Sequence, residues 1–326
     1  MDRSAKVLLC AADDGIMVDT IDAVLTANGY VPNLVIVADK DDVQAIGREI
    51  VDADIVYPNK ASLTRELIQS ASRLQLIHCG TGCDTVDLES AGEQGIHVCS
   101  TAHIMAQSTA EHTVFLLLAL AKNGLQYLEE MKAGNWHRRV GTELAGKAIG
   151  ILGYGHIGKI TARIAHSMGM KVLASRRNLE KGNEGGGFVT MVDLDTLLTE
   201  ADVVSLHLPL VRCGLNRTEA LIGDEELLKF GKKGLGWIIN TSRGAVINEG
   251  ALVEALENGT LRKAALDVFA TEPLPPDHRL RALPNVILSP HVAGETEDAL
   301  KRRYSQIALN AVRVLRGERP EFIVDR

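Results

Sequence analysis

Short apolar runs rich in valine and isoleucine alternate with longer amphipathic stretches along this chain of 326 residues. In the first third, the runs that read as buried strands are Val7–Leu9, Leu34–Val37, Asp54–Tyr57, Leu76–His78 and His97–Cys99. The stretches between them, such as Thr20–Asn28 and Leu63–Ser72, have helical spacing. Buried strands separated by helices predict parallel sheets with helices on both faces, an α/β fold.

The pattern restarts in the second half of the chain. Its six strand candidates are Ala148–Leu152, Lys171–Ala174, Val203–Leu206, Gly236–Asn240, Ala264–Asp267 and Val286–Leu288. Six strands with helical crossovers are typical of a dinucleotide-binding sheet. Since one domain usually holds ~100–200 residues, the second sheet predicts a second domain.

Two further helices are expected outside these sheets. Ser108–Lys122 joins the two halves, and because it is apolar nearly all round from Val114 onward, we expect it to be buried at a domain or subunit interface. Thr296–Leu315 is a second, amphipathic helix near the end of the chain.

The composition limits the partners and the location. The formal net charge of −7 argues against a nucleic-acid or anionic-membrane surface. The longest apolar run, Val114–Ala121, is shorter than the ~20 residues of a membrane span, and no signal-peptide core is evident, so we expect a cytoplasmic protein.

Cys79 and Cys83, with His78 beside them, could suggest a metal, but the zinc spacings are absent. Buried or turn thiols are the favoured interpretation, and no metal is expected.

A glycine-rich turn follows the strand candidate Ala148–Leu152. It reads Gly153-Tyr154-Gly155-His156-Ile157-Gly158 and opens a helix expected over Ile157–Met168. The first glycine permits the tight turn, the second lets the backbone approach a pyrophosphate, and the third allows close helix–strand packing. The phosphates would face the free N–H groups at the helix N-terminus. A plain structural turn is the alternative, but the flanking strand and helix favour a dinucleotide site.

The end of the next strand candidate indicates which dinucleotide binds. An acid at this point normally binds the ribose 2′-hydroxyl of NAD. This chain has Ser175, Arg176 and Arg177 there instead, and a hydroxyl with two guanidiniums would attract a 2′-phosphate. The sequence therefore favours NADP(H), with NAD(H) as the alternative if both arginines are solvated surface residues.

Polar residues follow three later strand candidates, at the carboxyl ends where α/β sheets bind ligands. His291 could donate a proton to a carbonyl oxygen during hydride addition, and Glu272 could orient the imidazole and stabilise its cation. Arg243 could clamp a carboxylate and polarise the adjacent carbonyl. Asp267 could accept a hydrogen bond from the nicotinamide carboxamide. Each residue alone has a structural alternative, such as a cap or a surface charge.

Several longer segments occur in the same order as the motifs of a known family. They are Glu143–Lys147, Leu206-His207-Leu208-Pro209-Leu210, Thr241-Ser242-Arg243-Gly244, Ala265–Phe269 with Glu272-Pro273, and Ser289-Pro290-His291. On these segments the chain resembles the D-isomer-specific 2-hydroxyacid dehydrogenase family, most strongly over residues 143–294. The resemblance implies two Rossmann-like, doubly wound domains with the active site in the interdomain cleft, and Arg243, Glu272 and His291 as catalytic residues.

The resemblance also implies the domain limits and the remaining contacts. The substrate domain would be discontinuous, residues 1–101 plus 296–326, and the dinucleotide-binding domain would be residues 102–295. Cofactor contacts beyond the glycine turn and 175–177 would be His207, Pro209, Thr241, Ser242, Asp267 and Gly294. Backbone N–H groups of Gly80, Thr81 and Gly82 would bind the substrate carboxylate as an anion nest, together with Arg243 and His291, although a simple turn is the alternative. The family is usually dimeric, so a homodimer is expected.

Two segments depart from the family pattern. Met105 stands where the family usually has an asparagine, so no hinge or cofactor contact is assigned there. The loop Val211–Arg217 looks longer than usual and contains Arg212 and Arg217. It could touch a phosphate, although a solvated insertion is the favoured interpretation.

The leading prediction is an oxidoreductase that reduces a small 2-keto acid, such as glyoxylate or hydroxypyruvate, to the D-2-hydroxy acid with NADPH. The second interpretation is the reverse reaction, the oxidation of a larger 2-hydroxy acid. An alternative from another class is a nucleotide-sensing binding protein that resembles a transcriptional co-repressor. Retention of Arg243, Glu272 and His291 favours an enzyme.

Overall fold

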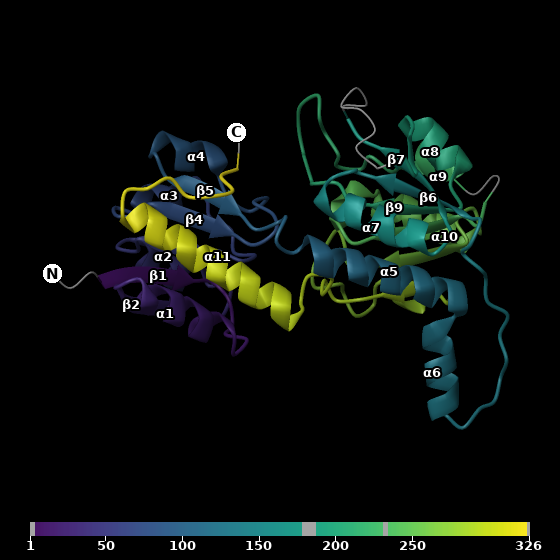
Figure 1. The fold of residues 1–326 in the computed structure, drawn as a ribbon, viewed down its shortest axis with the longest axis horizontal. Coiled ribbons are helices and arrows are strands. Elements are labelled where there is room, and N and C mark those ends of the chain that lie inside the picture. The colour runs from purple at the N-terminus through teal and green to yellow at the C-terminus, as the bar shows by residue number, and fades with distance from the viewer. Residues whose placement is uncertain (1–3, 178–186, 231–233, 325–326) are drawn as a thin grey trace. The chain divides into compact units, whose positions relative to one another are not determined.

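The computed structural model describes residues 4–177, 187–230 and 234–324, which belong to two compact units (Figure 1). Unit 1 comprises Met1–Met105 and Glu295–Arg326, and unit 2 comprises Ala106–Gly294. Each unit has a sheet of parallel strands joined by helical crossovers, which confirms the predicted α/β class. Each is described by itself below.

Unit 1 has a five-stranded parallel sheet in the order β2-β1-β3-β4-β5. Its strands are β1 (Ser4–Leu9), β2 (Val31–Ile36), β3 (Ile55–Tyr57), β4 (Leu76–Cys79) and β5 (His97–Ser100). Its helices are α1 (Met17–Ala27), α2 (Val43–Ile50), α3 (Arg65–Ser70), α4 (Leu88–Glu93) and the C-terminal α11 (Glu297–Leu315). The strand order reverses beside β1, and such switch points are where α/β sheets bind ligands.

Unit 2 has a seven-stranded parallel sheet in the order β12-β11-β10-β9-β6-β7-β8. Its strands are β6 (Ala148–Leu152), β7 (Lys171–Ser175), β8 (Val189–Met191), β9 (Val203–Leu206), β10 (Trp237–Asn240), β11 (Lys263–Leu266) and β12 (Val286–Leu288). Its helices are α5 (Ala106–Lys122), α6 (Gly124–Lys132), α7 (His156–Ser167), α8 (Leu194–Glu200), α9 (Asp224–Lys229) and α10 (Glu249–Glu257), with short 3-10 turns η2 (Gly244–Val246) and η3 (Arg279–Ala282). The order reverses between β6 and β9, which places the switch point beside the glycine turn.

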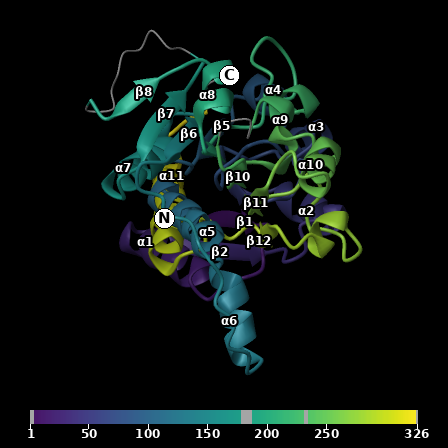
Figure 2. The same cartoon turned by 90° about the vertical axis from the view of Figure 1, so that its right-hand side faces the viewer.

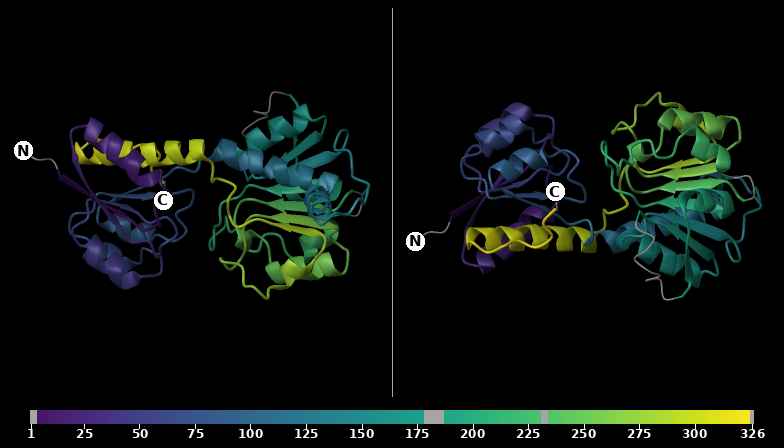
Figure 3. Two further views of the ribbon diagram at one scale, coloured as in Figure 1. Left: turned by 90° about the horizontal axis from the view of Figure 1, so that it is seen from below. Right: turned by 90° about the horizontal axis from the view of Figure 1, so that it is seen from above.

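Helices cover both faces of each sheet because successive strand residues point to opposite sides. In unit 2, Val203 packs with side chains of α5 and α7, whereas Val204 packs with those of α8, α9 and α10. In unit 1, Leu9 packs with α1 and α11, and Leu8 packs with α2 and α3. Figure 3 shows both sheets between their helical layers. Burial on both faces explains why the strands read as continuous apolar runs.

One expectation about unit 2 needs correction, and another stays open. The sheet has seven strands rather than six, because β8 is a three-residue edge strand in which only Val189 is buried, so it shows no apolar run. On helix α5, Phe115 is 50% and Leu118 is 39% exposed within this chain, so burial of these two side chains at a subunit interface stays a prediction. In the described residues, no helix is long and apolar enough to cross a membrane.

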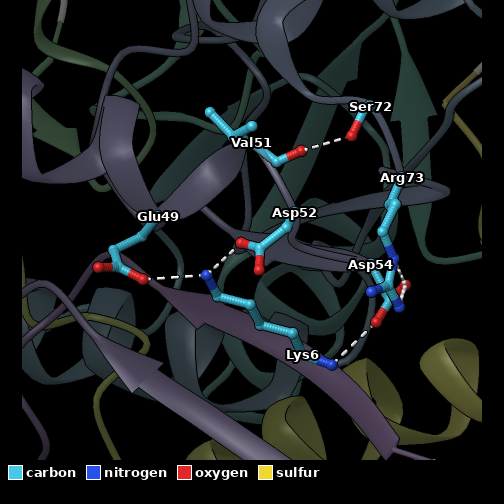
Figure 4. Close-up of polar contacts among 7 residues, drawn as sticks. All are labelled: Lys6, Glu49, Val51, Asp52, Asp54, Ser72 and Arg73. Carbon is cyan, nitrogen blue, oxygen red and sulfur yellow. Dashed lines mark hydrogen bonds and ion pairs between the residues drawn. The ribbon is translucent and has the colours of Figure 1, made fainter.

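A polar network anchors the amino end of β3 (Figure 4). Lys6 Nζ lies 2.9 Å from Glu49 Oε2 and also contacts Asp52. The backbone N–H of Lys6 donates to Asp54 Oδ2 at 2.9 Å, and Arg73 donates to Asp54 Oδ1 at 2.7 Å. Asp54 is 3% exposed, so these contacts offset the cost of burying its charge.

His78 on β4 is a buried titratable side chain that faces α11. Its Nδ1 lies 3.1 Å from the carbonyl oxygen of Cys79, and its Nε2 lies 3.1 Å from Nδ2 of Asn310. The amide nitrogen of Asn310 can only donate, so Nε2 is the unprotonated acceptor and the imidazole is neutral. Burial lowers the pKa of His78 to about 4.

Replacing His78 by glutamine should make the fold less sensitive to acid. The folded-state pKa of about 4 lies below the ordinary value of 6.5, so the unfolded chain takes up the proton first as the pH falls. This group should therefore cost wild-type protein about 3 kcal/mol of unfolding free energy between about pH 7 and pH 4, at ~1.4 kcal/mol per pKa unit. Denaturant titrations across this pH range should show that His78→Gln lacks this part of the loss.

The control for this measurement is His137→Gln, which alters an imidazole that is 70% exposed. Its pH dependence should follow that of wild-type protein. If His78→Gln and wild-type protein lose stability equally on acidification, the neutral buried state of His78 does not govern acid sensitivity.

Candidate active site

His291 and Glu272 form a hydrogen-bonded pair beyond the carboxyl ends of β11 and β12. Nδ1 of His291 lies 2.7 Å from Oε2 of Glu272, and the side chains are 26% and 25% exposed. Oε1 of Glu272 accepts a hydrogen bond from the backbone N–H of Phe269 at 3.2 Å. Because the carboxylate is held on one side by the backbone, its contact with Nδ1 fixes the orientation of the imidazole and directs Nε2 to the opposite side.

A buried carboxylate fixes the turn that carries His291. Asp267 directly follows β11 and is fully buried. Its Oδ1 accepts from Ser289 Oγ at 2.6 Å and from the N–H of Val292 at 3.0 Å. Its Oδ2 accepts from the N–H of Ala293 at 2.9 Å. His291 has a φ of 56°, which side-chain-bearing residues rarely adopt, so these bonds hold a strained turn.

A close backbone approach brings Arg243 beside the segment that carries Glu272. A Cβ on Gly244 would lie 1.9 Å from the carbonyl carbon of Phe269, so only glycine fits there. Phe269 also donates to Glu272, so the loops after β10 and β11 are packed together. Arg243 is half-buried, and its Nη1 donates to the carbonyl oxygen of Ser242 at 2.8 Å.

Two polar residues of α5 reach the same edge of the sheet. His112 Nε2 lies 3.1 Å from Ser289 Oγ and 3.6 Å from Asp267 Oδ1. Thr113 Oγ1 lies 2.8 Å from Thr241 Oγ1. Sequence reasoning missed both residues, and it missed the positioning role of Asp267. The one available signal was the presence of polar side chains in a helix that is otherwise apolar.

The glycine turn lies between β6 and α7, and α7 begins at His156, directly before Ile157. A Cβ on Gly153 would lie 2.5 Å from the carbonyl oxygen of His207, and a Cβ on Gly158 would lie 2.3 Å from that of Gly153. A Cβ on Gly155 would meet nothing within 4 Å. The outer glycines are therefore required by packing, whereas the middle glycine borders open space at a helix N-terminus, as a pyrophosphate cradle requires.

His207 borders this turn and has an orphaned ring nitrogen. Its Nε2 lies 2.9 Å from Ser205 Oγ. Its Nδ1 is buried and has no hydrogen-bond partner in the part of the chain that the structure describes. Burial lowers the pKa of His207 to about 3, so the imidazole is neutral at physiological pH. A buried polar atom without a partner, beside an open glycine cradle, fits a polar ligand such as a dinucleotide.

Ser175, Arg176 and Arg177 stand at the end of β7, next to the glycine turn. The N–H of Gly153 donates to the carbonyl oxygen of Ser175 at 2.9 Å. Ser175 is buried, Arg176 is half-buried and Arg177 is exposed. Nη2 of Arg177 donates to the carbonyl oxygen of Asn216 at 3.4 Å. The strand end and the loop 211–217 are therefore neighbours.

The two arginines of the loop 211–217 pair with one acid. Arg212 and Arg217 lie 2.6 and 3.1 Å from the carboxylate of Glu219. Of the remaining predicted contacts, Thr241 and Ser242 are buried after β10, Pro209 is exposed after β9, and Gly294 is half-buried at the end of unit 2. Within residues 4–177, 187–230 and 234–324, no group of three or more His, Cys, Asp or Glu residues could hold a metal ion.

The loop Gly80-Thr81-Gly82 follows β4 in unit 1. The carbonyl oxygen of Gly80 accepts from the N–H and from Oγ1 of Thr101, both at 2.9 Å. The carbonyl oxygen of Thr81 accepts from Ser100 Oγ at 3.2 Å. In a trans peptide the N–H points away from the preceding C=O, so the N–H groups of Thr81 and Gly82 point away from these residues. Two such N–H groups are the minimum for an anion nest.

The chain matches known proteins over most of its length. Residues 114–293 match the family described as D-isomer specific 2-hydroxyacid dehydrogenase, NAD binding domain. The chain is 36% identical over 271 residues to a glyoxylate reductase of Aeropyrum pernix, covering 80% of this chain and 79% of that protein. It is 38% identical over 282 residues to a D-3-phosphoglycerate dehydrogenase of Methanocaldococcus jannaschii, covering 85% of this chain and 52% of that protein. It thus spans about half the length of the second relative.

Solved structures share the fold. A protein of Thermus thermophilus superposes with a TM-score of 0.86 at 31% identity, covering 98% of this chain and 100% of that one. An acyclic imino acid reductase in complex with NADPH and D-arginine gives a TM-score of 0.84 at 26% identity, with the same coverage. An NAD-complexed D-isomer specific 2-hydroxyacid dehydrogenase of Lactobacillus delbrueckii gives 0.76 at 25%, again with that coverage. The chain belongs to the D-isomer-specific 2-hydroxyacid dehydrogenase family of NAD(P)-dependent oxidoreductases.

Proposed function

We propose that this enzyme reduces a small 2-keto acid to the D-2-hydroxy acid with NADPH. The observation that carries the proposal is the 2.7 Å contact between His291 Nδ1 and Glu272 Oε2, beside the loop that carries Arg243. In the reduction, a hydride adds to the carbonyl carbon and a proton adds to its oxygen. A relative that shares 36% identity is a glyoxylate reductase, which supports a small 2-keto acid as substrate.

His291 supplies the proton in this mechanism. Because Glu272 engages Nδ1, the proton moves from Nε2 to the carbonyl oxygen as negative charge develops there. Glu272 stabilises the imidazolium before the transfer, and Phe269 holds the carboxylate in place. Asp267 keeps the turn of His291 in its strained conformation. In the oxidative direction, the neutral imidazole accepts the same proton.

Each unit by itself offers groups that are suited to orienting a substrate. The N–H groups of Thr81 and Gly82 donate to the substrate carboxylate. Arg243 contributes a guanidinium that binds the carboxylate and polarises the carbonyl, so its charge stabilises the oxyanion of the transition state. Binding of the carboxylate fixes which face of the carbonyl receives the hydride.

The cofactor supplies the hydride when it is bound, and the residues of unit 2 would hold it. The glycine turn and the N-terminus of α7 would hold the pyrophosphate, and His207 Nδ1 offers a hydrogen-bonding atom beside it. Ser175, Arg176 and Arg177 at the end of β7 would bind a 2′-phosphate, which favours NADPH over NADH. One structural relative was solved with NADPH and another with NAD, so the preference rests on these side chains.

Consumption of NADPH with a panel of 2-keto acids tests the reaction. Glyoxylate, hydroxypyruvate and pyruvate should each be reduced at the expense of NADPH. With each of them, kcat/KM for NADPH should be higher than kcat/KM for NADH.

The variant His291→Asn tests the proton donor. It should lower kcat by about 100-fold or more, because a positioned general acid contributes ~10²–10⁴-fold. His137→Asn, at a side chain that is 70% exposed, is the matched control and should keep the wild-type rate.

Three results of this assay would contradict parts of the proposal. A near-normal rate in His291→Asn would remove the proton-donor role. A higher kcat/KM with NADH would reverse the cofactor preference. No turnover of any 2-keto acid, despite tight NADPH binding, would favour a nucleotide-sensing protein.

Two glycine substitutions separate cofactor binding from packing. Gly155→Ala should leave the melting temperature unchanged, because its Cβ meets nothing within 4 Å. It should weaken NADPH binding by about 10-fold or more, because the methyl group occupies the approach of the pyrophosphate and charge-assisted hydrogen bonds are lost. Gly158→Ala should lower the melting temperature, since its Cβ would lie 2.3 Å from a carbonyl oxygen. Unaltered NADPH affinity in Gly155→Ala would place the pyrophosphate elsewhere.

We propose that the protein is a homodimer through the apolar face of α5 and α6. Figure 2 shows α6 projecting away from the rest of unit 2. On α6, Leu128 is 60% exposed and Met131 is 54% exposed. Trp136, which follows the helix, is 79% exposed. Exposed apolar patches of this kind mark protein–protein contacts.

Charge introduced into this face should produce monomers. Leu128→Glu should halve the mass measured by sedimentation, because an unpaired carboxylate would be buried in the contact. Glu129→Gln, at the next and also exposed position, should leave the mass unchanged. A wild-type protein that sediments as a monomer at micromolar concentration would exclude the dimer.

A further inference from the structure

Arg303 is a buried cation in unit 1 whose hydrogen-bonding capacity is only partly used. It lies on α11 and is 7% exposed. Nη2 donates to the hydroxyl of Tyr304 at 3.0 Å, and Nη1 contacts Glu295 at 3.4 Å. Nε is buried and has no hydrogen-bond partner among the residues that the structure describes. A guanidinium carries more N–H donors than these two contacts use, and buried polar groups normally have partners.

The acids near Arg303 do not saturate it. Glu295 is 44% exposed, and its 3.4 Å contact is longer than the ~2.8 Å of a charge-assisted hydrogen bond. Asp14 is already occupied, since it accepts from the hydroxyl of Tyr304 and from two backbone N–H groups at the start of α1. The charge of Arg303 is therefore available to an anion from outside the chain.

Two tyrosines connect Arg303 to the glycine loop of unit 1. The guanidinium carbon lies 4.9 Å from the ring centroid of Tyr304. Tyr304 packs edge-on against Tyr57, with the ring centroids 6.2 Å apart. On the other side, a Cβ on Gly80 would lie 3.8 Å from the hydroxyl of Tyr57. Tyr57 ends β3, and Gly80 follows the neighbouring β4, so this series of contacts lies at the carboxyl edge of one sheet.

We propose that Arg303 and Tyr57 form a subsite for a second anionic group of the substrate, so that the preferred substrates are 2-keto acids with a carboxylate or phosphate at the far end. The inference rests on the proposed reduction of 2-keto acids and adds the class of side chain. The nest binds the first carboxylate, and the unused N–H donors of Arg303 bind the second anion.

The tyrosine hydroxyl is suited to the same role. Burial raises the pKa of Tyr57 to about 12, so the phenol keeps its proton and can donate. Its hydrogen bond to Asn59 Oδ1 is long, with 3.4 Å between the two oxygen atoms. An anion held between Arg303 and Tyr57 would receive one charged and one neutral donor.

Matched substrate pairs test the subsite on the full-length enzyme. Oxaloacetate and 2-oxobutyrate have equal chain length, as do 2-oxoglutarate and 2-oxopentanoate, but only the first of each pair carries a second carboxylate. Phosphohydroxypyruvate against hydroxypyruvate tests a phosphate as the source of the charge. The dianion of at least one pair should have a KM about 10-fold lower or more, the size expected for a charge-assisted hydrogen bond to a buried arginine.

Two variants distinguish a binding role from a structural one. Arg303→Met removes the charge at similar volume and should raise the KM for the dianion by about 10- to 100-fold, with the monoanion KM and kcat nearly unchanged. Glu295→Gln removes the competing carboxylate and should lower the KM for the dianion, which a merely structural arginine would not predict. Arg302→Met, at the exposed neighbouring position on α11, is the control and should change neither KM.

The possible failures are separable. Equal KM values within every substrate pair, or equal effects of Arg303→Met on dianion and monoanion, would overturn the subsite and leave 2-keto acid reduction intact. If Arg303→Met does not fold, the wild-type pairs and Glu295→Gln decide the question. If no 2-keto acid is turned over, the proposed function fails, and calorimetry with succinate against butyrate still tests the subsite. Equal binding of these two acids would overturn it.

Discussion

The carboxylate of Asp267 determines the geometry on which the proposed chemistry depends. A fully buried carboxylate is tolerated only when its oxygens are hydrogen-bonded, and here Ser289, Val292 and Ala293 of the segment 289–293 donate to it. Burial of this charge and the strained turn of His291 therefore stabilise one another. Glu272 completes the arrangement by engaging a ring nitrogen whose position the turn has already set. Two carboxylates thus have different roles, one holding the backbone and the other holding the imidazole.

The sequence predicted that Arg243, Glu272 and His291 lie at one edge of a sheet, because the carboxyl ends of parallel strands meet there. The structure pairs His291 with Glu272 and packs the loop of Arg243 against that of Glu272, while their catalytic roles stay a prediction. An apolar run followed by polar residues is visible without coordinates. The role of Asp267 could not be predicted, since its donors lie 22 to 26 residues further along the chain. The sequence also did not predict that Phe115 and Leu118 are the side chains of α5 that this chain leaves exposed. A periodic pattern does not distinguish burial against the same chain from burial against another molecule.

The sequence places the glycine turn at the end of β6 but does not distinguish the roles of its three glycines. The motif alone treats its three glycines as one signal. In the structure, Gly153 and Gly158 are required by contacts within the protein, whereas Gly155 borders open space. Contacts within the protein therefore leave only the middle glycine of the turn unexplained. The orphaned Nδ1 of His207 is a second such feature, in a residue whose backbone carbonyl borders Gly153 of the same turn. Their coincidence supports a ligand more strongly than the spacing of the glycines does.

Sequence motifs indicate the reaction class of this enzyme, but they do not indicate the residue proposed to select the substrate. The residues proposed for proton transfer lie in motifs of unit 2, so the reaction class could be inferred before the fold was known. Arg303 lies in an amphipathic helix of unit 1, where an arginine normally extends into solvent. Its neighbour Arg302 is exposed, and the letters of the sequence do not distinguish the two. Arg303 differs in being buried against Tyr304, with Nε lacking a partner in the described chain, and this is the basis for proposing that it binds an anion. How completely a buried charge is compensated is therefore visible in the structure and not in the sequence, and the proposed choice of substrate rests on that difference.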